Sequence, residues 1–267
     1  MIAMNILVCF KVTPDLDQLP PDGWEVDRAA LTVETGFVKS MINPYDESAL
    51  ELALRFAEDA PGPVKLTALT VGDRSADRYL KMLYALKFDR AVRLETGADL
   101  RFTPEGIAAA IAAFVSRNPH QLIIMGRQSG VGDNAATPLL AAEKLGWPCI
   151  AHVTEIRSLQ EDLLKVRAQA DDGFLSYAAR PPLVAAVGNV PHAYLRVPTL
   201  KERLGVREKK VEIVAAALPA EEGAGCTLTG LDVIDRRRAG LKIEGATPRE
   251  KARALYELYL KERLAKL

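Results

Sequence analysis

QLIIMGRQSGVGDNAATPLLAAEKL, residues 121–145, predicts a strand, a loop and a helix in that order. The apolar run 121–125 is typical of a buried parallel strand, and 139–145 has the composition of a helix. A glycine-bearing loop between two such elements can bind phosphate, because its backbone N–H groups and the helix dipole both attract anions. Thr137 would add a hydroxyl, and Pro138 suits the first helical turn because it has no N–H.

The loop by itself leaves two interpretations open. It is either a phosphate site or an ordinary connection, and the pattern favours neither. Gly126, Gly130 and Gly132 would let the backbone approach a ligand closely. No Gly-Lys-Ser/Thr is present, so this is not the P-loop of ATPases. Asp133 fits equally as a cap of the following helix and as a partner for a ribose hydroxyl.

The bulk composition is that of a globular protein without a basic excess. The 267 residues are 49% hydrophobic and 26% charged, and 35 basic residues balance 35 acidic ones. Zero net charge argues against a general nucleic-acid binder. No apolar run is long enough for a membrane span, so we expect no membrane insertion. The first residues lead directly into a strand-like run, so we expect no signal peptide.

The nucleophilic and titratable residues do not form a catalytic pattern. Cys9, Cys149 and Cys226 are far apart, which predicts neither a disulfide framework nor a metal site and favours a reducing compartment, the cytoplasm by default. Cys9 lies in a strand-like run and is expected to be a small packed residue. Asp46 and Glu47 are adjacent and would point in different directions on a helix, so they make a poor acid/base pair. We therefore expect no catalytic residues.

Outward from the loop, strand-like and helix-like segments alternate. The expected strands are 6–10, 64–71, 91–94 and 121–125, and the expected helices begin at Asn43, Ala76, Thr103 and Leu139. Asn43 is a good N-cap, Pro44 suits the first helical position, and Asp46 favours the positive end of the dipole. This order predicts an α/β fold: a mostly parallel, Rossmann-like sheet with helices on both faces, suited to adenine nucleotides.

In the last third of the chain, strand-like segments follow one another without helix-like segments between them. Strands are expected at 152–158, 164–170, 174–178 and 182–188, the middle two joined by a turn at Asp171–Gly173. From about Pro191 the core-building pattern ends, and 191–204 and 215–225 are expected to be extended surface segments. Thr247 and Glu250 then form a capping box for a final helix. The sequence thus predicts an α/β nucleotide-binding domain, 1–190, and an arm, 191–267, that packs on a partner subunit.

Several segments are expected to meet where a ligand would bind. Residues 9–11, 71–73 and the Gly126 loop each follow a predicted strand. Ligands of open α/β sheets bind outside the carboxyl ends of the strands, at a topological switch point. With the helix start at Asn43, these segments could surround one adenine nucleotide.

The same pieces resemble the β subunit of electron-transfer flavoproteins over nearly the whole chain. The matching pieces are LVCFK (7–11), INPYDE (42–47), LIIMGRQ (122–128), GWP (146–148), the Asp172-Gly173 hairpin and RVPTL (196–200). The resemblance implies a heterodimer whose larger α subunit carries the redox-active FAD. It implies a structural AMP in this chain, or a second FAD in members that bifurcate electrons.

The resemblance also implies a set of site residues and partners. Electrons would pass from dehydrogenases of the acyl-CoA type to a quinone-linked oxidoreductase, in the cytoplasm or a mitochondrial matrix. Leu200 would lie in the loop that recognises partner dehydrogenases. The implied nucleotide-binding residues are Cys9, Asn43, Pro44, Tyr45, Asp46, Val71, Gly126, Arg127, Gln128, Gly130, Gly132, Asp133, Asn134, Ala135, Ala136 and Thr137.

Two departures bear on which nucleotide is held. Val131 and Ala136 stand where the family usually has an acidic residue and a glutamine. The loop matches the bifurcating pattern only at Gly132, Asp133 and Ala135, so AMP is favoured over a second FAD. Two other functions stay open: a free-standing adenine-nucleotide-binding module, and an ATP-dependent enzyme, which the missing P-loop lysine disfavours. A capped C-terminal helix beyond a long extended segment favours the subunit over the module.

Overall fold

The computed structural model describes residues 3–20, 23–160, 162–218, 228–234, 240 and 242–266. Contacts divide the chain into two units, residues 1–230 and 231–267, which are described separately. Cys226 and most of the expected extended segment 215–225 lie outside the described residues.

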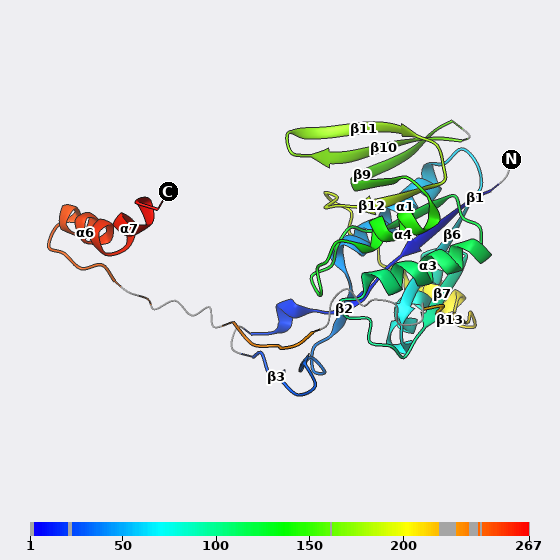
Figure 1. The fold of residues 1–267 in the computed structure, drawn as a ribbon. Helices are drawn as coiled ribbons and strands as arrows, with labels where there is room; N and C mark the ends of the chain where they lie inside the picture. The colour runs from blue at the N-terminus through cyan, green and yellow to red at the C-terminus, as the bar shows by residue number, and fades with distance from the viewer. Residues whose placement is uncertain are drawn as a thin grey trace. The chain divides into compact units, whose positions relative to one another are not determined.

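The larger unit is built on one mixed sheet (Figure 1). Nine strands of the described residues form it, in the spatial order β11 (Gly173–Ala179), β10 (Leu163–Ala170), β9 (Cys149–Gln160), β12 (Leu183–Val187), β8 (Leu122–Gly126), β1 (Met4–Cys9), β6 (Val64–Gly72), β7 (Arg90–Glu95) and β13 (Glu212–Ala215). Neighbours from β9 to β13 are parallel, whereas β9, β10 and β11 are antiparallel. The mostly parallel sheet predicted from the sequence is confirmed.

Helices cover both faces of the parallel part, which explains its continuous apolar runs. Along β1, Ile6 and Val8 pack with one core cluster, and Leu7 and Cys9 pack with the other, because successive side chains of a strand point to opposite faces. The first cluster contains α1 (Pro44–Asp59) and α2 (Asp77–Ala85). The second contains α3 (Pro104–Arg117) and α4 (Thr137–Leu145). Each central strand is therefore buried between two helical layers.

The larger unit also contains short elements that were not expected from the sequence. They are two small antiparallel sheets, β2 (Val12–Pro14) with β5 (Ser40–Ile42) and β3 (Val26–Asp27) with β4 (Thr32–Val33), and two 3-10 turns, Leu16–Gln18 and Arg74–Ala76. Segments of two or three residues are too short to show periodicity, so the sequence gives no sign of them.

The chain after residue 190 is more ordered than expected. Helix α5 (Leu200–Gly205) begins with a capping box of Thr199 and Glu202, and strand β13 adds to the sheet edge beside β7. The expectation that residues 191–204 are extended throughout is therefore wrong. Arg90 of β7 and Glu212 of β13 form an ion pair at 2.8 Å that helps to hold the edge. A four-residue, largely exposed edge strand has no buried face from which to predict it.

The smaller unit carries the expected C-terminal helix. It consists of α6 (Pro248–Leu255), a π-helical turn (Tyr256–Leu260) and α7 (Lys261–Leu264). The capping box is confirmed, since Thr247 accepts a hydrogen bond from the Glu250 N–H and the Glu250 carboxylate accepts one from the Thr247 N–H. Leu255, Leu258 and Tyr259 are exposed on it. None of the helices described here is long and apolar enough to cross a membrane.

Candidate functional site

The strand order creates a topological switch point between β1 and β8. The chain passes from β1 to β6 and β7 on one side, and then returns to β8 on the other side of β1. The N-terminus of α1 approaches the same point, because Asp46 bonds residues at the ends of β1 and β8. A pocket of about 660 Å³ lies here, lined by residues that follow β1, β6, β7 and β8. Such a place and size are typical of a small-molecule site.

The structure brings most of the expected nucleotide-site residues together in this pocket. Those that line it are Cys9, Asn43, Asp46, Val71, Gly126, Arg127, Gln128, Gly132, Asn134 and Thr137. Those that do not are Pro44 and Tyr45, in the first turn of α1, and Gly130, Asp133, Ala135 and Ala136, in the glycine loop.

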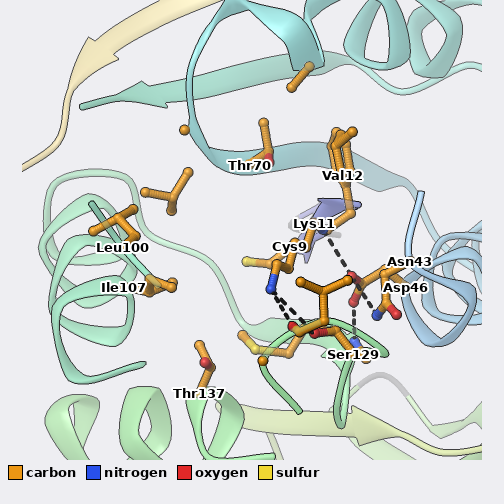
Figure 2. A pocket seen from close by; sticks show the side chains of 18 of the residues that line it. Cys9, Lys11, Val12, Asn43, Asp46, Thr70, Leu100, Ile107, Ser129 and Thr137 are labelled. Carbon is orange, nitrogen blue, oxygen red and sulfur yellow. Dashed lines mark hydrogen bonds between the residues drawn. The ribbon is translucent and has the colours of Figure 1, made fainter. Parts of the chain in front are cut away.

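Sequence reasoning missed one wall of the pocket, which includes Arg101, and it did not assign a role to Lys11. The missed wall consists of the loop after β7, residues 96–102, and of Ile107 and Ile111 on α3. Leu100 and Ile107 lie on one side of the pocket in Figure 2, and Asn43 and Asp46 lie on the other, with Lys11 between them. The loop follows a strand end like the other three segments, and that was the signal available. Lys11 was placed near the site but was given no role.

Asp46 connects three segments beneath the pocket. Its Oδ1 accepts the Gly126 N–H at 2.8 Å, and its Oδ2 accepts the Lys11 N–H at 2.9 Å and the Asn43 Nδ2–H at 3.0 Å. Burial raises the pKa of Asp46 to about 6, against the opposing effect of these hydrogen bonds and of the Lys11 charge. The carboxylate thus joins the start of α1 to the ends of β1 and β8.

Asn43 occupies the N-cap position of α1 but does not cap it with its side chain. Its Nδ2 instead donates to Asp46 and, at 2.8 Å, to the carbonyl of Gln128. The expected side-chain cap is therefore wrong, because the Asn43 side chain makes its hydrogen bonds to Asp46 and Gln128 and none to the backbone of α1. The side chain is buried, and its Oδ1 has no hydrogen-bond partner within the described chain. A buried acceptor without a partner is costly, so this oxygen is suited to a donor supplied by a ligand.

The glycine loop has an unusual backbone. Gly132, Asp133 and Ala135 have φ angles of 82°, 26° and 52°, in the left-handed region that favours glycine. Asn134 holds this turn, since its Oδ1 accepts the Ala136 N–H at 3.1 Å. Ala136 is the N-cap residue of α4, and no side chain caps this helix. Of the two roles that the sequence left open for Asp133, the helix cap is therefore ruled out and the ribose contact stays a prediction. Alternating backbone conformations of this kind turn N–H groups toward an anion.

Gly126 is required where β8 passes the first turn of α1. A Cβ at this position would lie 2.5 Å from Asp46 Oδ1 and 2.8 Å from the Tyr45 Cβ. Such distances are too short for any side chain. The guanidinium of Arg127 lies over the Tyr45 ring, 5.5 Å from its centre. Tyr45 thus contacts Arg127, which lines the pocket, and does not line it itself.

Cys9 brings a thiol to the lining of the pocket. Cys9 is buried in the second core cluster, as expected for a packed residue, and burial raises the pKa of its thiol well above the usual range. No group of three His, Cys, Asp or Glu suited to a metal ion occurs in the part of the chain that the structure describes.

A second feature lies at the other end of α1. Leu200 is 73% exposed, and Tyr194, Val197 and Leu204 are also exposed, at 82%, 77% and 60%. Sequence reasoning named only Leu200, although the spacing of three to four residues was a signal for the others. We call residues 194–204 the apolar segment. Arg196 fastens it to α1 by bonds to Glu51, which is buried, and to Glu58.

Comparison with known protein families identifies this architecture. A family model described as "Electron transfer flavoprotein domain" matches residues 30–219. The chain is 37% identical over 262 residues, covering 98% of itself and 99% of the relative, to the Escherichia coli K12 protein named "Putative electron transfer flavoprotein subunit YgcR".

Other relatives carry related names. The electron transfer flavoprotein subunit beta of Megasphaera elsdenii is 30% identical over 235 residues, which are 85% of this chain and 84% of that protein. The caffeyl-CoA reductase-Etf complex subunit CarD of Acetobacterium woodii is 26% identical over 255 residues, which are 86% of this chain and 93% of that protein.

Proposed function

This chain belongs to the electron transfer flavoprotein family and is of its β-subunit type, and from that premise we propose its place in the complex. It pairs with an α subunit that carries FAD. It binds one AMP in the pocket between β1 and β8, and it presents the apolar segment to dehydrogenases of the acyl-CoA type. Electrons leave the complex to a quinone-linked oxidoreductase, and the chain itself does no substrate chemistry.

The pocket residues support AMP as the ligand. The glycine loop and Thr137 at the N-terminus of α4 offer N–H and hydroxyl donors to a phosphate, and Lys11 adds a positive charge. Leu100 and Ile107 offer an apolar surface to the flat face of a base. AMP would be a structural ligand here, and it would tie the ends of the central strands to α4.

Three alternatives remain to be distinguished from this one. A second FAD at the same place would make the chain a bifurcating subunit; it would need room for a flavin beyond the adenosine part. A free-standing adenine-nucleotide module would have no use for the exposed apolar side chains of α6 and of the apolar segment. An ATP-dependent enzyme is disfavoured, since no lysine follows the glycine loop in P-loop spacing.

Scattered cysteines and the family favour the cytoplasm as the compartment, with the mitochondrial matrix as the alternative.

Coexpression with an α subunit of the family tests the proposal. We expect a heterodimer that holds flavin, and that a dehydrogenase of the acyl-CoA type reduces in the presence of its substrate. A chain that stays alone in solution, with or without nucleotide, would support the module instead.

A further inference from the structure

Lys11 occupies a distinctive position in the pocket. It follows β1, and its side chain reaches across to the glycine loop (Figure 2). Its Nζ donates to the carbonyl of Val131 at 2.8 Å and to the hydroxyl of Ser129 at 3.3 Å. A Cβ at Gly132 would lie 3.9 Å from the same nitrogen. The ammonium group therefore lies against the part of the loop that has left-handed backbone.

The charge of Lys11 is not neutralised by a direct ion pair. No carboxylate among the described residues lies within ion-pair distance of its Nζ. The nearby Asp46 uses its oxygens to accept the Lys11 backbone N–H and two other donors. Burial lowers the pKa of the Lys11 ammonium, which Asp46 opposes. Lys11 is exposed, and an ammonium at a pocket surface without a carboxylate partner is suited to an anion.

The other cations at the pocket are already engaged. Arg101 forms an ion pair with Asp99 at 2.7 Å and also donates to the carbonyl of Leu31. Arg127 lines the pocket, but its guanidinium lies over the ring of Tyr45. All three cations line the pocket, and of these three Lys11 is the one whose side chain donates hydrogen bonds to the glycine loop.

The Lys11 ammonium has a further hydrogen-bond donor to offer. A lysine ammonium has three N–H donors, and the two bonds to the loop leave one of them. We propose that this donor binds the phosphate of the nucleotide, so that Lys11 makes the pocket select a nucleoside phosphate over the free nucleoside. The proposal rests on the nucleotide site proposed above. Lys11 would bridge the phosphate and the loop, so ligand binding and loop order would support each other.

A purely structural role for Lys11 makes a different prediction. If the ammonium only holds the loop, its removal loosens the whole pocket and weakens adenosine and AMP alike. If it binds phosphate, its removal affects AMP and spares adenosine. Comparing these two ligands therefore separates the two roles.

The test is calorimetric titration of the full chain, freed of bound nucleotide, with AMP and with adenosine. We expect wild type to bind AMP more tightly than adenosine, and Lys11→Met to lose about ten- to a hundredfold in AMP affinity. Adenosine affinity should change by less than about twofold, since no charged contact is lost. Lys11→Arg should recover part of the AMP affinity, because it keeps the charge.

Lys65 provides a matched control. It is exposed on β6 and pairs with Asn5 at the amino end of the sheet, opposite to the pocket. Lys65→Met should leave both affinities unchanged. Equal losses for AMP and adenosine in Lys11→Met, or no loss for AMP, would overturn the role of Lys11 while the nucleotide site stands. If wild type binds no AMP, the nucleotide site itself is wrong and the role of Lys11 fails with it.

Discussion

At the scale of single residues, Gly126 marks the closest approach between the central sheet and α1. Replacing it with alanine would place a methyl group against Asp46 and Tyr45, including backbone atoms that cannot move aside. We expect Gly126→Ala to lower the free energy of unfolding by about 1–3 kcal/mol, as overpacking typically does. Urea denaturation of the full chain measures this.

Gly130 is the matched control for that change. Gly130 lies in the loop that follows β8, and a Cβ there would meet no atom of the described residues within 4 Å. Gly130→Ala should therefore shift the free energy of unfolding by less than about 0.5 kcal/mol. Equal effects of the two substitutions would show that the contact of Gly126 with α1 is not what constrains this position.

The residues of the site were predictable only in part. Cys9, Val71 and Gly126 could be placed together because parallel strands end at one edge of a sheet, and that argument needs no side-chain detail. The hydrogen bonds of Asn43 could not be predicted, because local capping rules ignore tertiary partners. The Asn43 side-chain amide donates hydrogen bonds to the carbonyl of Gln128 and to Asp46, and local sequence patterns predict neither bond.

At the scale of elements, α1 links the pocket to the apolar segment. Its buried Glu51 accepts bonds from Arg196 at 2.9 and 3.1 Å and from Arg55 at 3.0 Å. Glu51→Gln removes the charge and keeps the shape. We expect amide hydrogen exchange in residues 192–200 to become about tenfold faster, since a charge-assisted pair contributes roughly 1.5 kcal/mol or more.

The pH dependence of the same contact has a defined sign. Burial raises the pKa of Glu51, but the bonds from Arg196 and Arg55 outweigh it and hold the pKa below the usual value. A lowered folded-state pKa means that the contribution is complete above about pH 4.3 and is lost as the pH falls through the folded value. Protection of the amides of 192–200 should thus be constant from neutral pH down to about pH 5.

Glu58→Gln is the control for Glu51→Gln. It removes the more exposed carboxylate partner of Arg196, so it should speed amide exchange in 192–200 less than Glu51→Gln does. If Glu51→Gln exchanges like wild type, Glu51 does not hold the segment.

The exposed side chains of the apolar segment lead to a docking prediction. We expect Leu200→Ala to weaken binding of a partner dehydrogenase about thirtyfold, the loss of roughly 2 kcal/mol typical of an apolar anchor. Val197→Ala should also weaken it, because Val197 is equally exposed on the same segment. The measurement is reduction of the assembled heterodimer by its dehydrogenase at varied heterodimer concentration.

Leu139, an exposed leucine on α4, is the control for docking. Leu139→Ala should leave the dependence of the reduction rate on heterodimer concentration unchanged. Thermal stability should be the same as that of wild type in all three variants. If only Val197→Ala reduces docking, the anchor is Val197, and the role inferred for Leu200 is wrong.

Elements were predictable where their pattern was long. The helix beginning at Pro44 and the strands around Ile6 and Leu122 were expected within one or two residues, because buried parallel strands and capped helices have strong signals. Strand β13 was not, since its four residues are mostly exposed and its pairing with β7 depends on the completed sheet. Short edge elements are decided by tertiary contacts.

At the scale of the whole molecule, we expect the two units to have different functions: the larger unit folds by itself, and the smaller unit strengthens binding to the α subunit. The smaller unit exposes Leu255, Leu258 and Tyr259 and has few residues with which to bury them. We expect a chain ending at residue 246 to bind the α subunit at least about tenfold more weakly, because this apolar surface is lost. Its urea unfolding should match that of wild type, since the core clusters are intact. A truncated chain that copurifies with the α subunit as well as wild type would contradict the role of the arm.

We propose that this β-type subunit holds one AMP in the pocket between β1 and β8. The test is to denature the purified heterodimer and to identify the released nucleotides by mass spectrometry. We expect one AMP per heterodimer in addition to the FAD of the α subunit. Two FAD molecules and no AMP would favour the bifurcating alternative, and FAD alone at a single equivalent would contradict the nucleotide site.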